Sequence, residues 1–425
     1  MLMENTVSMS DFVHAIAEIL DLASPALNKH HNKVAYLAGQ LAYQMDIHDE
    51  SEFANIILAA MLHDIGAFSI DERVNLLNFD VDDDDTNNHS IIGYKLLKDF
   101  KPLAKAAQII RYHHVRYDEL RTDVPLGSYI IHLADRVAVL LDEEREIFMQ
   151  LPEISQKLHE VEDRFHPQAL AAFDQMLNKA YFWIDIFNPT QGVAMMEQLG
   201  PNKRIVGLEA LRNLAKVFAQ IIDFRSRYTA THSCGVAAVA YELSKIAGFS
   251  EHECQLMEVA GYLHDIGKLA IPNSILEKPG PLDELEFNHI RKHTYYTYRI
   301  LSKIDGLEHV AAWAGYHHER NDGSGYPFKI KGQNLSRLSR IMAITDIVTA
   351  LAEDRPYRAG MSESQTLKIL DKQVESGGID RGIVDMVRAN YPRINAVRIQ
   401  AQQDALLEYE AFFNADTLLL LSVAA

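Results

Sequence analysis

Apolar residues with helical spacing run through almost the whole chain. Between positions 208 and 222 they recur every three or four residues, the pattern of an amphipathic helix with one face on a core. The residues that carry it are Leu208, Leu211, Ala215, Phe218 and Ile222. We find no convincing run of alternating apolar and polar residues. The pattern therefore predicts an all-α fold.

Polar pairs suited to helix starts support this prediction. In each pair a Ser or Asp that can cap a helix is followed three positions later by Glu or Gln, which can bond back to it. The pairs are Asp49 with Glu52, Ser250 with Glu253, Asp283 with Glu286, and Ser362 with Gln365. The first two precede matching segments in the two halves of the chain, which indicates an internal repeat.

The repeat holds in detail. AAMLHDIGAFSI (59–70) aligns with AGYLHDIGKLAI (260–271), and HHNKVAYLA (30–38) aligns with HSCGVAAVA (232–240). Two copies of about 200 residues are whole domains, longer than the units of a solenoid. We therefore predict two tandem helical bundle domains. The expected parts are a first domain at 10–180, a Pro- and Gly-containing linker at 181–205, a second domain at 206–395 and a helical extension at 396–425.

Composition limits the function classes. The formal net charge of −18 argues against a protein that coats DNA or RNA, but local cations near a metal can still capture a small phosphate compound. Two cysteines, Cys234 and Cys254, are too few for a disulfide framework, so a reducing cytoplasm is expected. The N-terminus does not have the pattern of a signal peptide, and no apolar stretch is long enough for a membrane span.

Residue types that bind metals occur twice in the same order. The C-terminal set is His232, His264, Asp265, His293, His317, His318 and Asp346. The N-terminal set is His30, His63, Asp64, His89, His113, His114 and Asp135, and it predicts a second metal site. Imidazoles and carboxylates together suit first-row divalent ions such as Fe, Mn, Ni or Zn.

The adjacent His-Asp pair favours two ions. Neighbouring residues at a helix end point about 100° apart, so Asp265 can bridge two ions while His264 binds one. A bridging water would then have its pKa lowered from about 15.7 to roughly 7, which yields hydroxide for attack on a phosphodiester. Lys268, one helical turn after His264, is expected on the same face, within reach of a phosphate oxygen.

Three segments of the second half resemble the HD-GYP phosphodiesterase domain, over about 200–395. They are HDIGK (264–268), HHERNDGSGYP (317–327) and ITDIVTALAEDRPYR (344–358). The resemblance implies hydrolysis of a cyclic dinucleotide, cyclic di-GMP or 3'3'-cyclic GMP-AMP, to a linear dinucleotide or a mononucleotide. The sequence leaves open which of these substrates is preferred.

The resemblance also implies roles for individual residues. The C-terminal set would hold two iron or two manganese ions, with Lys268 on a phosphate and Tyr326 lining the nucleotide site. Arg355 and Arg358 match basic phosphate-binding positions. Some members hold a third metal with a Glu four residues before the first His; here that position is Tyr228, so two metals are expected.

The first half is similar to the wider HD superfamily at its ligand positions but departs from it elsewhere. Ala67 replaces the lysine, HHVRYDEL (113–120) replaces the GYP loop and DEEREIF (142–148) replaces the DRPYR segment. We expect a regulatory, ligand-sensing or dimer-forming role for this domain, with a homodimer or a signalling protein as partner.

Other interpretations stay open from the sequence alone. The protein could be a non-catalytic receptor for a cyclic dinucleotide or a partner protein, or an HD phosphohydrolase of another nucleotide. The intact ligand set with Lys268 favours an enzyme over a receptor. The GYP loop and the basic pair Arg355 and Arg358 favour a cyclic dinucleotide. The acidic segment 80–85 lacks the glycine and distal glutamate of a calcium loop and is expected to be a solvated loop.

Overall fold

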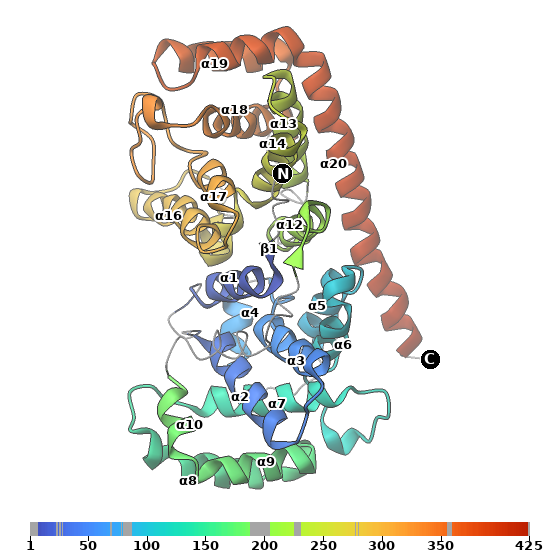
Figure 1. The fold of residues 1–425 in the computed structure, drawn as a ribbon. Coiled ribbons are helices and arrows are strands. Elements are labelled where there is room, and N and C mark those ends of the chain that lie inside the picture. The colour runs from blue at the N-terminus through green and yellow to red at the C-terminus, as the bar shows by residue number, and fades with distance from the viewer. Residues whose placement is uncertain are drawn as a thin grey trace. The chain divides into compact units, whose positions relative to one another are not determined.

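Helices form nearly all of the structure (Figure 1). The computed structural model describes residues 7–22, 24, 27, 29–68, 70–77, 79, 87–187, 205–224, 231–276, 278, 280–354 and 359–423, without the side chains of 71, 87, 205 and 414–423. Within these residues the one sheet is a pair of two-residue strands, β1 (Val7–Ser8) and β2 (Ile205–Val206). The all-α prediction is confirmed.

The chain divides into two compact units. One unit is Ser8–Ile205, and the other begins at Val206 and also includes Val7. The helices of the first unit are α1 (Met9–Asp21), α2 (His30–Gln44), α3 (Glu50–Leu62), α4 (Ile70–Asn75), α5 (Asn87–Leu97), α6 (Ala104–Arg111), α7 (Leu126–Leu140), α8 (Ile147–His159), α9 (Pro167–Leu177) and α10 (Ala180–Asp185), with short 3-10 turns at Lys101–Leu103, Tyr117–Glu119 and Glu162–Arg164. Its centre is α2, which packs on α3 and α7.

The second unit repeats this plan and adds a long helix. Its helices are α12 (Leu208–Asp223), α13 (His232–Ile246), α14 (Glu251–Leu263), α15 (Asn273–Leu276), α16 (Glu284–Leu301), α17 (Glu308–Gly315), α18 (Arg337–Ala352), α19 (Glu363–Glu375) and α20 (Arg381–Val423), with 3-10 turns η6 (Ile266–Ala270) and η7 (Gly332–Asn334). Here α13 is central and packs on α14, α18 and α20.

The predicted capping pairs begin helices where expected. Ser250 and Glu253 form a reciprocal capping box at the start of α14, and the Asp49 side chain accepts from the Glu52 N–H at the start of α3. Both helices are 13 residues long, and in both the next residue is the histidine of the His-Asp pair. A helix start and a fixed length therefore place this pair equivalently in the two domains.

The predicted apolar face of α12 is also present. Leu211, Ala215, Phe218 and Ile222 are buried, and Leu208 at the helix start is half-buried. The two cysteines are free and buried.

Helix α20 begins well before the predicted extension. It runs from Arg381 through Pro392, with non-helical backbone at Asn390 (φ −126°, ψ 17°). Proline removes one backbone hydrogen bond and kinks a helix, but packing of the flanking turns can keep both segments in one element. Tyr391 and Ile394 on either side of Pro392 are buried. The segment from 396 therefore continues a helix that the second domain already anchors.

Some predicted features lie outside the described residues. They are most of the linker (188–204), the acidic segment 80–85, Tyr228, Arg355 and Arg358. Among the described residues, no helix combines the length and apolar character needed to cross a membrane.

Candidate functional site

The His-Asp turn of the second domain is held tightly against α16. A Cβ on Gly267 would lie 1.9 Å from the carbonyl oxygen of His293, so only glycine permits this approach. The Gly267 N–H donates to Thr297 Oγ1 (3.1 Å), and the Thr297 hydroxyl donates to the carbonyl of His264 (3.0 Å). Helix α16 is thereby locked to the turn, and this brings His293 to the pair from α14.

One group of ligand types gathers around Asp346 of α18. His232 Nε2 lies 3.4 Å and His264 Nε2 4.0 Å from Asp346 Oδ1. His264 Nε2 is also 3.2 Å from Asp265 Oδ2. The ligand atoms of His232, His264 and Asp346 all lie within 4.8 Å of one another.

A second group gathers on the other side of Asp265. His293 Nε2 lies 3.4 Å and His317 Nε2 3.9 Å from Asp265 Oδ1. His318 completes a cluster with these two histidines. The two oxygens of Asp265 therefore face different groups of imidazoles.

The histidines present nitrogens suited to a metal. Three of them hydrogen-bond through Nδ1 to a backbone carbonyl three residues earlier, which requires Nδ1 to carry the proton and leaves the Nε2 lone pair facing the cluster. These bonds are His264 to Gly261 (2.8 Å), His293 to Ile290 (2.6 Å) and His317 to Ala314 (2.6 Å). Burial lowers the pKa of His293, His317 and His318 to about 3, so these rings are neutral, the form that binds metals.

The carboxylates keep their negative charge. Burial opposes ionisation of Asp265, but His264 and Lys268 hold its pKa well below the usual value. Burial likewise opposes ionisation of Asp346, and the hydrogen bond with His232 lowers its pKa. The site is therefore a buried anionic centre lined by imidazoles, and such a centre needs a cation.

The carboxylates raise the pKa of the two imidazoles nearest to them, those of His264 and His232. Burial would lower the pKa of His264, but Asp265 and Asp346 raise it. Burial would also lower the pKa of His232, but Glu353 and Asp346 raise it well above the usual value. A bound proton or a metal ion would neutralise the carboxylates here, so the donor set fits divalent metals.

Lys268 contacts one of the predicted ligands. Residues 266–270 form the 3-10 turn η6, in which side chains three apart align. Lys268 follows Asp265 by three residues, and its Nζ lies 2.5 Å from Asp265 Oδ2. Its side chain is 27% exposed, so the ammonium lies at the rim of the cluster.

The GYP loop folds back onto the second group of ligands. The Glu319 carboxylate accepts from the N–H groups of Phe328 (2.6 Å) and Ile330 (2.9 Å), which closes the loop. A Cβ on Gly325 would lie 2.6 Å from the carbonyl oxygen of His318, so glycine is needed there too. The Tyr326 ring centroid lies 4.9 Å from that of His318, beside the cluster.

Two charged residues that the sequence analysis missed belong to this site. Arg291 places its guanidinium carbon 5.0 Å from the Tyr326 ring centroid. Glu353 Oε2 lies 3.0 Å from His232 Nδ1. The sequence could have indicated Glu353 as a site residue, because it follows Asp346 by seven residues, two helical turns later at the end of α18. Arg291 had no comparable signal, because it lies two residues before His293 on α16 and such residues point to different sides of a helix.

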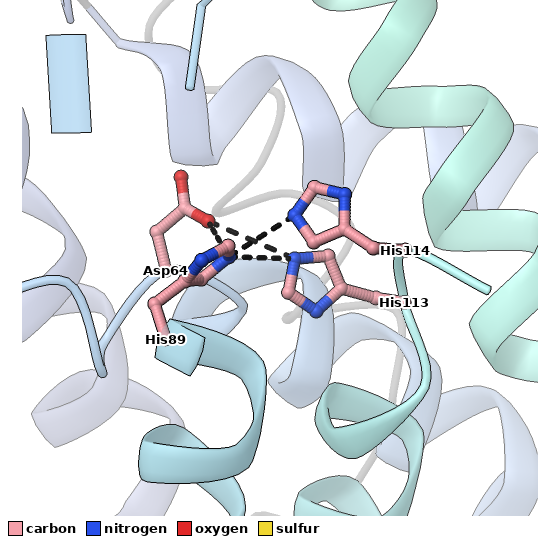
Figure 2. Close-up of side chains that lie close together, drawn as sticks. All are labelled: Asp64, His89, His113 and His114. Carbon is pink, nitrogen blue, oxygen red and sulfur yellow. Dashed lines mark hydrogen bonds and ion pairs between the residues drawn. The ribbon is translucent and has the colours of Figure 1, made fainter. Parts of the chain in front are cut away.

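The first domain brings its own ligand types together in the same way. Figure 2 shows Asp64, His89, His113 and His114 converging, with His89 Nε2 3.3 Å from Asp64 Oδ1 and from His113 Nε2, and 3.1 Å from His114 Nε2. These four residues form one candidate metal cluster.

A second group in the first domain also matches its counterpart. His63 Nε2 lies 3.2 Å from Asp64 Oδ2, and His30 Nε2 lies 3.1 Å from Asp135 Oδ1. Asp64 therefore faces imidazoles with both oxygens, as Asp265 does. A Cβ on Gly66 would lie 2.0 Å from the carbonyl oxygen of His89, so the same close approach is made.

The surroundings of this first cluster differ from those of the second. Asp135 is 4% exposed and pairs with the adjacent Arg136, while Asp346 is 13% exposed and followed by Ile347. The Arg136 guanidinium also donates to the carbonyls of Leu76 (3.3 Å) and Phe79 (3.4 Å). The first cluster thus has an internal arginine on one carboxylate, whereas the matching carboxylate of the second cluster is slightly exposed.

Comparisons with known proteins agree with this duplicated plan. Models of the HD domain match residues 29–140 and 216–383. The chain is 29% identical over 413 residues to 3'3'-cGAMP-specific phosphodiesterase 1 of Vibrio cholerae, covering 91% of this chain and 93% of the relative. It is 36% identical over 167 residues to the cyclic di-GMP phosphodiesterase response regulator RpfG of Xanthomonas campestris, covering 39% of this chain and 44% of the relative.

A solved structure shows the same fold. The chain matches a cyclic GMP-AMP-specific phosphodiesterase of Vibrio cholerae, V-cGAP3, with a TM-score of 0.65 and 22% identity. The match covers 91% of this chain and 98% of that one.

Proposed function

The chain belongs to the HD-GYP type of HD-domain proteins, with two HD domains in tandem, and we propose that its second domain hydrolyses a phosphodiester bond of a cyclic dinucleotide. The observation that carries this proposal is Asp265, whose two oxygens face separate groups of imidazoles beside the GYP loop. The relative that matches almost the whole chain is named for 3'3'-cGAMP, so this substrate is the first choice over cyclic di-GMP.

The seven C-terminal ligand types would hold two divalent ions, iron or manganese before nickel or zinc. Such ions supply Lewis acidity to the phosphate and lower the pKa of the attacking water. The protein's own contribution is to fix the ligands on or directly after five helices of the domain, α13, α14, α16, α17 and α18, so that little reorganisation is needed on binding. The number and identity of the ions are part of the proposal.

Other side chains of the second domain would hold the substrate. Lys268 offers an ammonium at the rim, where it can leave Asp265 for a phosphate oxygen. The half-buried ring of Tyr326, with Arg291 against it, offers a face on which a base can stack. We also propose Arg355 and Arg358 as phosphate contacts, on the strength of the sequence resemblance.

The test is turnover of both cyclic dinucleotides by anaerobically purified protein, with metal content counted on the same sample. We expect Asp265→Asn or His264→Ala to reduce hydrolysis by at least about a thousandfold, since the water would lose its activation. The helical circular dichroism should stay unchanged. Full activity in these variants would refute the site, and metal without hydrolysis of either substrate would favour the receptor interpretation.

For the first domain we propose bound metal without catalysis. Its ligand residues are buried, Ala67 stands where the second domain has Lys268, and Arg136 forms an ion pair with Asp135. These are features of a closed structural site. About four metals per chain, falling to about two in Asp64→Asn while hydrolysis persists, would support this proposal. About two metals per chain in the wild type, lost in Asp265→Asn but kept in Asp64→Asn, would contradict it. A regulatory or dimer-forming role remains our proposal for this domain.

A further inference from the structure

His232 is held differently from three other histidines of its cluster. His264, His293 and His317 direct Nδ1 to backbone carbonyls, whereas His232 Nδ1 lies 3.0 Å from Glu353 Oε2. Glu353 is 6% exposed. A carboxylate on the far nitrogen fixes the ring orientation and makes the near nitrogen a stronger metal ligand.

The first domain has no such partner at the matching position. Glu353 follows Asp346 by seven residues, and the residue seven after Asp135 is Asp142. Asp142 is exposed and accepts from the Glu144 N–H (2.9 Å) in a turn. The pair of His232 and Glu353 is therefore a feature of the domain to which hydrolysis is assigned.

The carboxylate of Glu353 is in turn held by the long helix α20. Gln402 Nε2 donates to Glu353 Oε2 at 3.1 Å. A second hydrogen bond fixes the orientation of the Gln402 amide, because its Oε1 accepts from Arg398 Nη1 one turn earlier on α20. Arg398 is itself 7% exposed and donates from Nε to Asn395 Oδ1 (2.9 Å).

Helix α13 leaves room for this arrangement. It begins at His232, and one turn later Gly235 faces Gln402. A Cβ on Gly235 would lie 2.9 to 3.1 Å from three side-chain atoms of Gln402, closer than ordinary packing. The absence of a side chain at 235 therefore allows Gln402 to pass α13 and reach Glu353.

We propose that Glu353 and Gln402 are positioning residues for His232, and that helix α20 is thereby part of the support of the metal site. Glu353 favours the form of the His232 ring with a proton on Nδ1, so that Nε2 faces Asp346. Gln402 donates to Glu353 and thereby offsets part of the cost of burying its charge. The assignment deepens the proposed function, since it concerns the same site, but its main readout is metal binding.

The test compares metal retention of full-length variants against a chelator series. We expect Glu353→Ala to weaken binding at the second-domain site by about 10- to 100-fold. Glu353→Gln, which keeps an acceptor but loses the charge, should lie between this variant and the wild type. Gln402→Ala should weaken binding severalfold. Asp265→Asn serves as the reference for loss of that site.

Two matched controls come from the chain itself. Gln400 lies on the same helix but is exposed and bonds only locally to Asp404 (2.9 Å), so Gln400→Ala should bind metal like the wild type. Asp142→Ala tests the matching position of the first domain and should also have no effect. Metal retention in Glu353→Gln and Gln402→Ala equal to that in Gln400→Ala would overturn the proposal, even if Glu353→Ala fails to fold.

Kinetics separates this inference from the proposed function. For a positioning role on a metal ligand we expect kcat to fall in Gln402→Ala while KM changes by less than about twofold. A rise in KM alone would show that Gln402 acts on substrate and would overturn the inference. If the wild type hydrolyses neither dinucleotide, the proposed function fails, and the metal titration still decides the role of Glu353 and Gln402.

Discussion

Asp265 places one oxygen 3.2 Å from His264 Nε2 and the other 3.4 Å from His293 Nε2. His264 and His293 belong to different groups of ligand residues, so the Asp265 carboxylate lies between the two groups and contacts both. Around it, single residues differ in what they can contribute to substrate. Lys268 contacts Asp265, and Tyr326 contacts His318 through its ring. The ring face of Tyr326, more than its hydroxyl, is therefore the expected point of contact with a base.

Substitutions at Tyr326 test this distinction. Base stacking on an aromatic side chain contributes about 1–3 kcal/mol, so Tyr326→Ala should raise KM roughly 5- to 160-fold. Tyr326→Phe keeps the ring and should stay within about threefold of the wild type. Steady-state kinetics of both variants on 3'3'-cGAMP and cyclic di-GMP decides the matter. Equal losses in the two variants would assign the role to the hydroxyl.

Substitutions at Lys268 test the cation at the rim. Lys268→Ala should lower kcat/KM about 10- to 100-fold, because a charge-assisted contact with a phosphate oxygen is lost. Lys268→Arg keeps the charge and should recover part of this loss. Metal content measured on the same samples is the control, since Lys268 also pairs with Asp265. Unchanged kinetics in Lys268→Ala would remove it from the substrate site.

At the scale of elements, a helix start and a glycine place each cluster. The capping pairs begin α3 and α14, and the histidine of the His-Asp pair follows each helix directly. The glycine two positions after the Asp then lets the next ligand helix approach, α5 at Gly66 and α16 at Gly267. Both features belong to backbone geometry, so they recur in both domains although the surrounding side chains differ.

Gly267→Ala should separate α16 from the turn. The added Cβ meets the His293 carbonyl at 1.9 Å, so the backbone must shift, at a cost of about 1–3 kcal/mol. We expect loss of the second group of ligands and with it at least tenfold lower kcat. Gly207→Ala is the control, because no atom lies within 4 Å of the added Cβ. Thermal unfolding with metal counting checks both, and wild-type values for Gly267→Ala would contradict the packing argument.

At the scale of the whole molecule, one ligand plan serves two different environments. In the first domain the carboxylate ligand Asp135 pairs with Arg136, and in the second Asp346 is more exposed and His232 has Glu353 as partner. Closed metal sites stabilise a fold, and sites with an accessible side allow chemistry. This difference is the basis of our proposal that the first domain binds metal without catalysis and the second hydrolyses the substrate.

Removal of metal should affect the two domains separately. Ligand binding stabilises a fold by about 2.7 kcal/mol when the free ligand is 100 times its Kd, so chelation should lower the unfolding temperature of the wild type. In Asp64→Asn, the part of this shift that belongs to the first domain should be absent. Calorimetry with and without chelator measures both, and a chelator effect equal in the two proteins would contradict metal binding by the first domain.

Much of this protein follows from the sequence alone. Helical spacing and capping pairs predicted an all-α fold, because local patterns of apolar and polar residues set helices, and the internal repeat predicted two tandem domains. The ordered ligand types and the GYP segment indicated the family and the chemistry of a cyclic dinucleotide phosphodiesterase.

Other properties were decided only by tertiary structure. Lys268 pairs with Asp265 from within a 3-10 turn, and the spacing of residues revealed neither the turn nor this partner. Arg136 and Glu353 have hydrogen-bond partners that are far away in the sequence. Arg136 donates to the carbonyl of Phe79, and Glu353 contacts His232 and Gln402. Local sequence determines which side chains share a helix face, whereas burial and long-range hydrogen bonds depend on which helices meet.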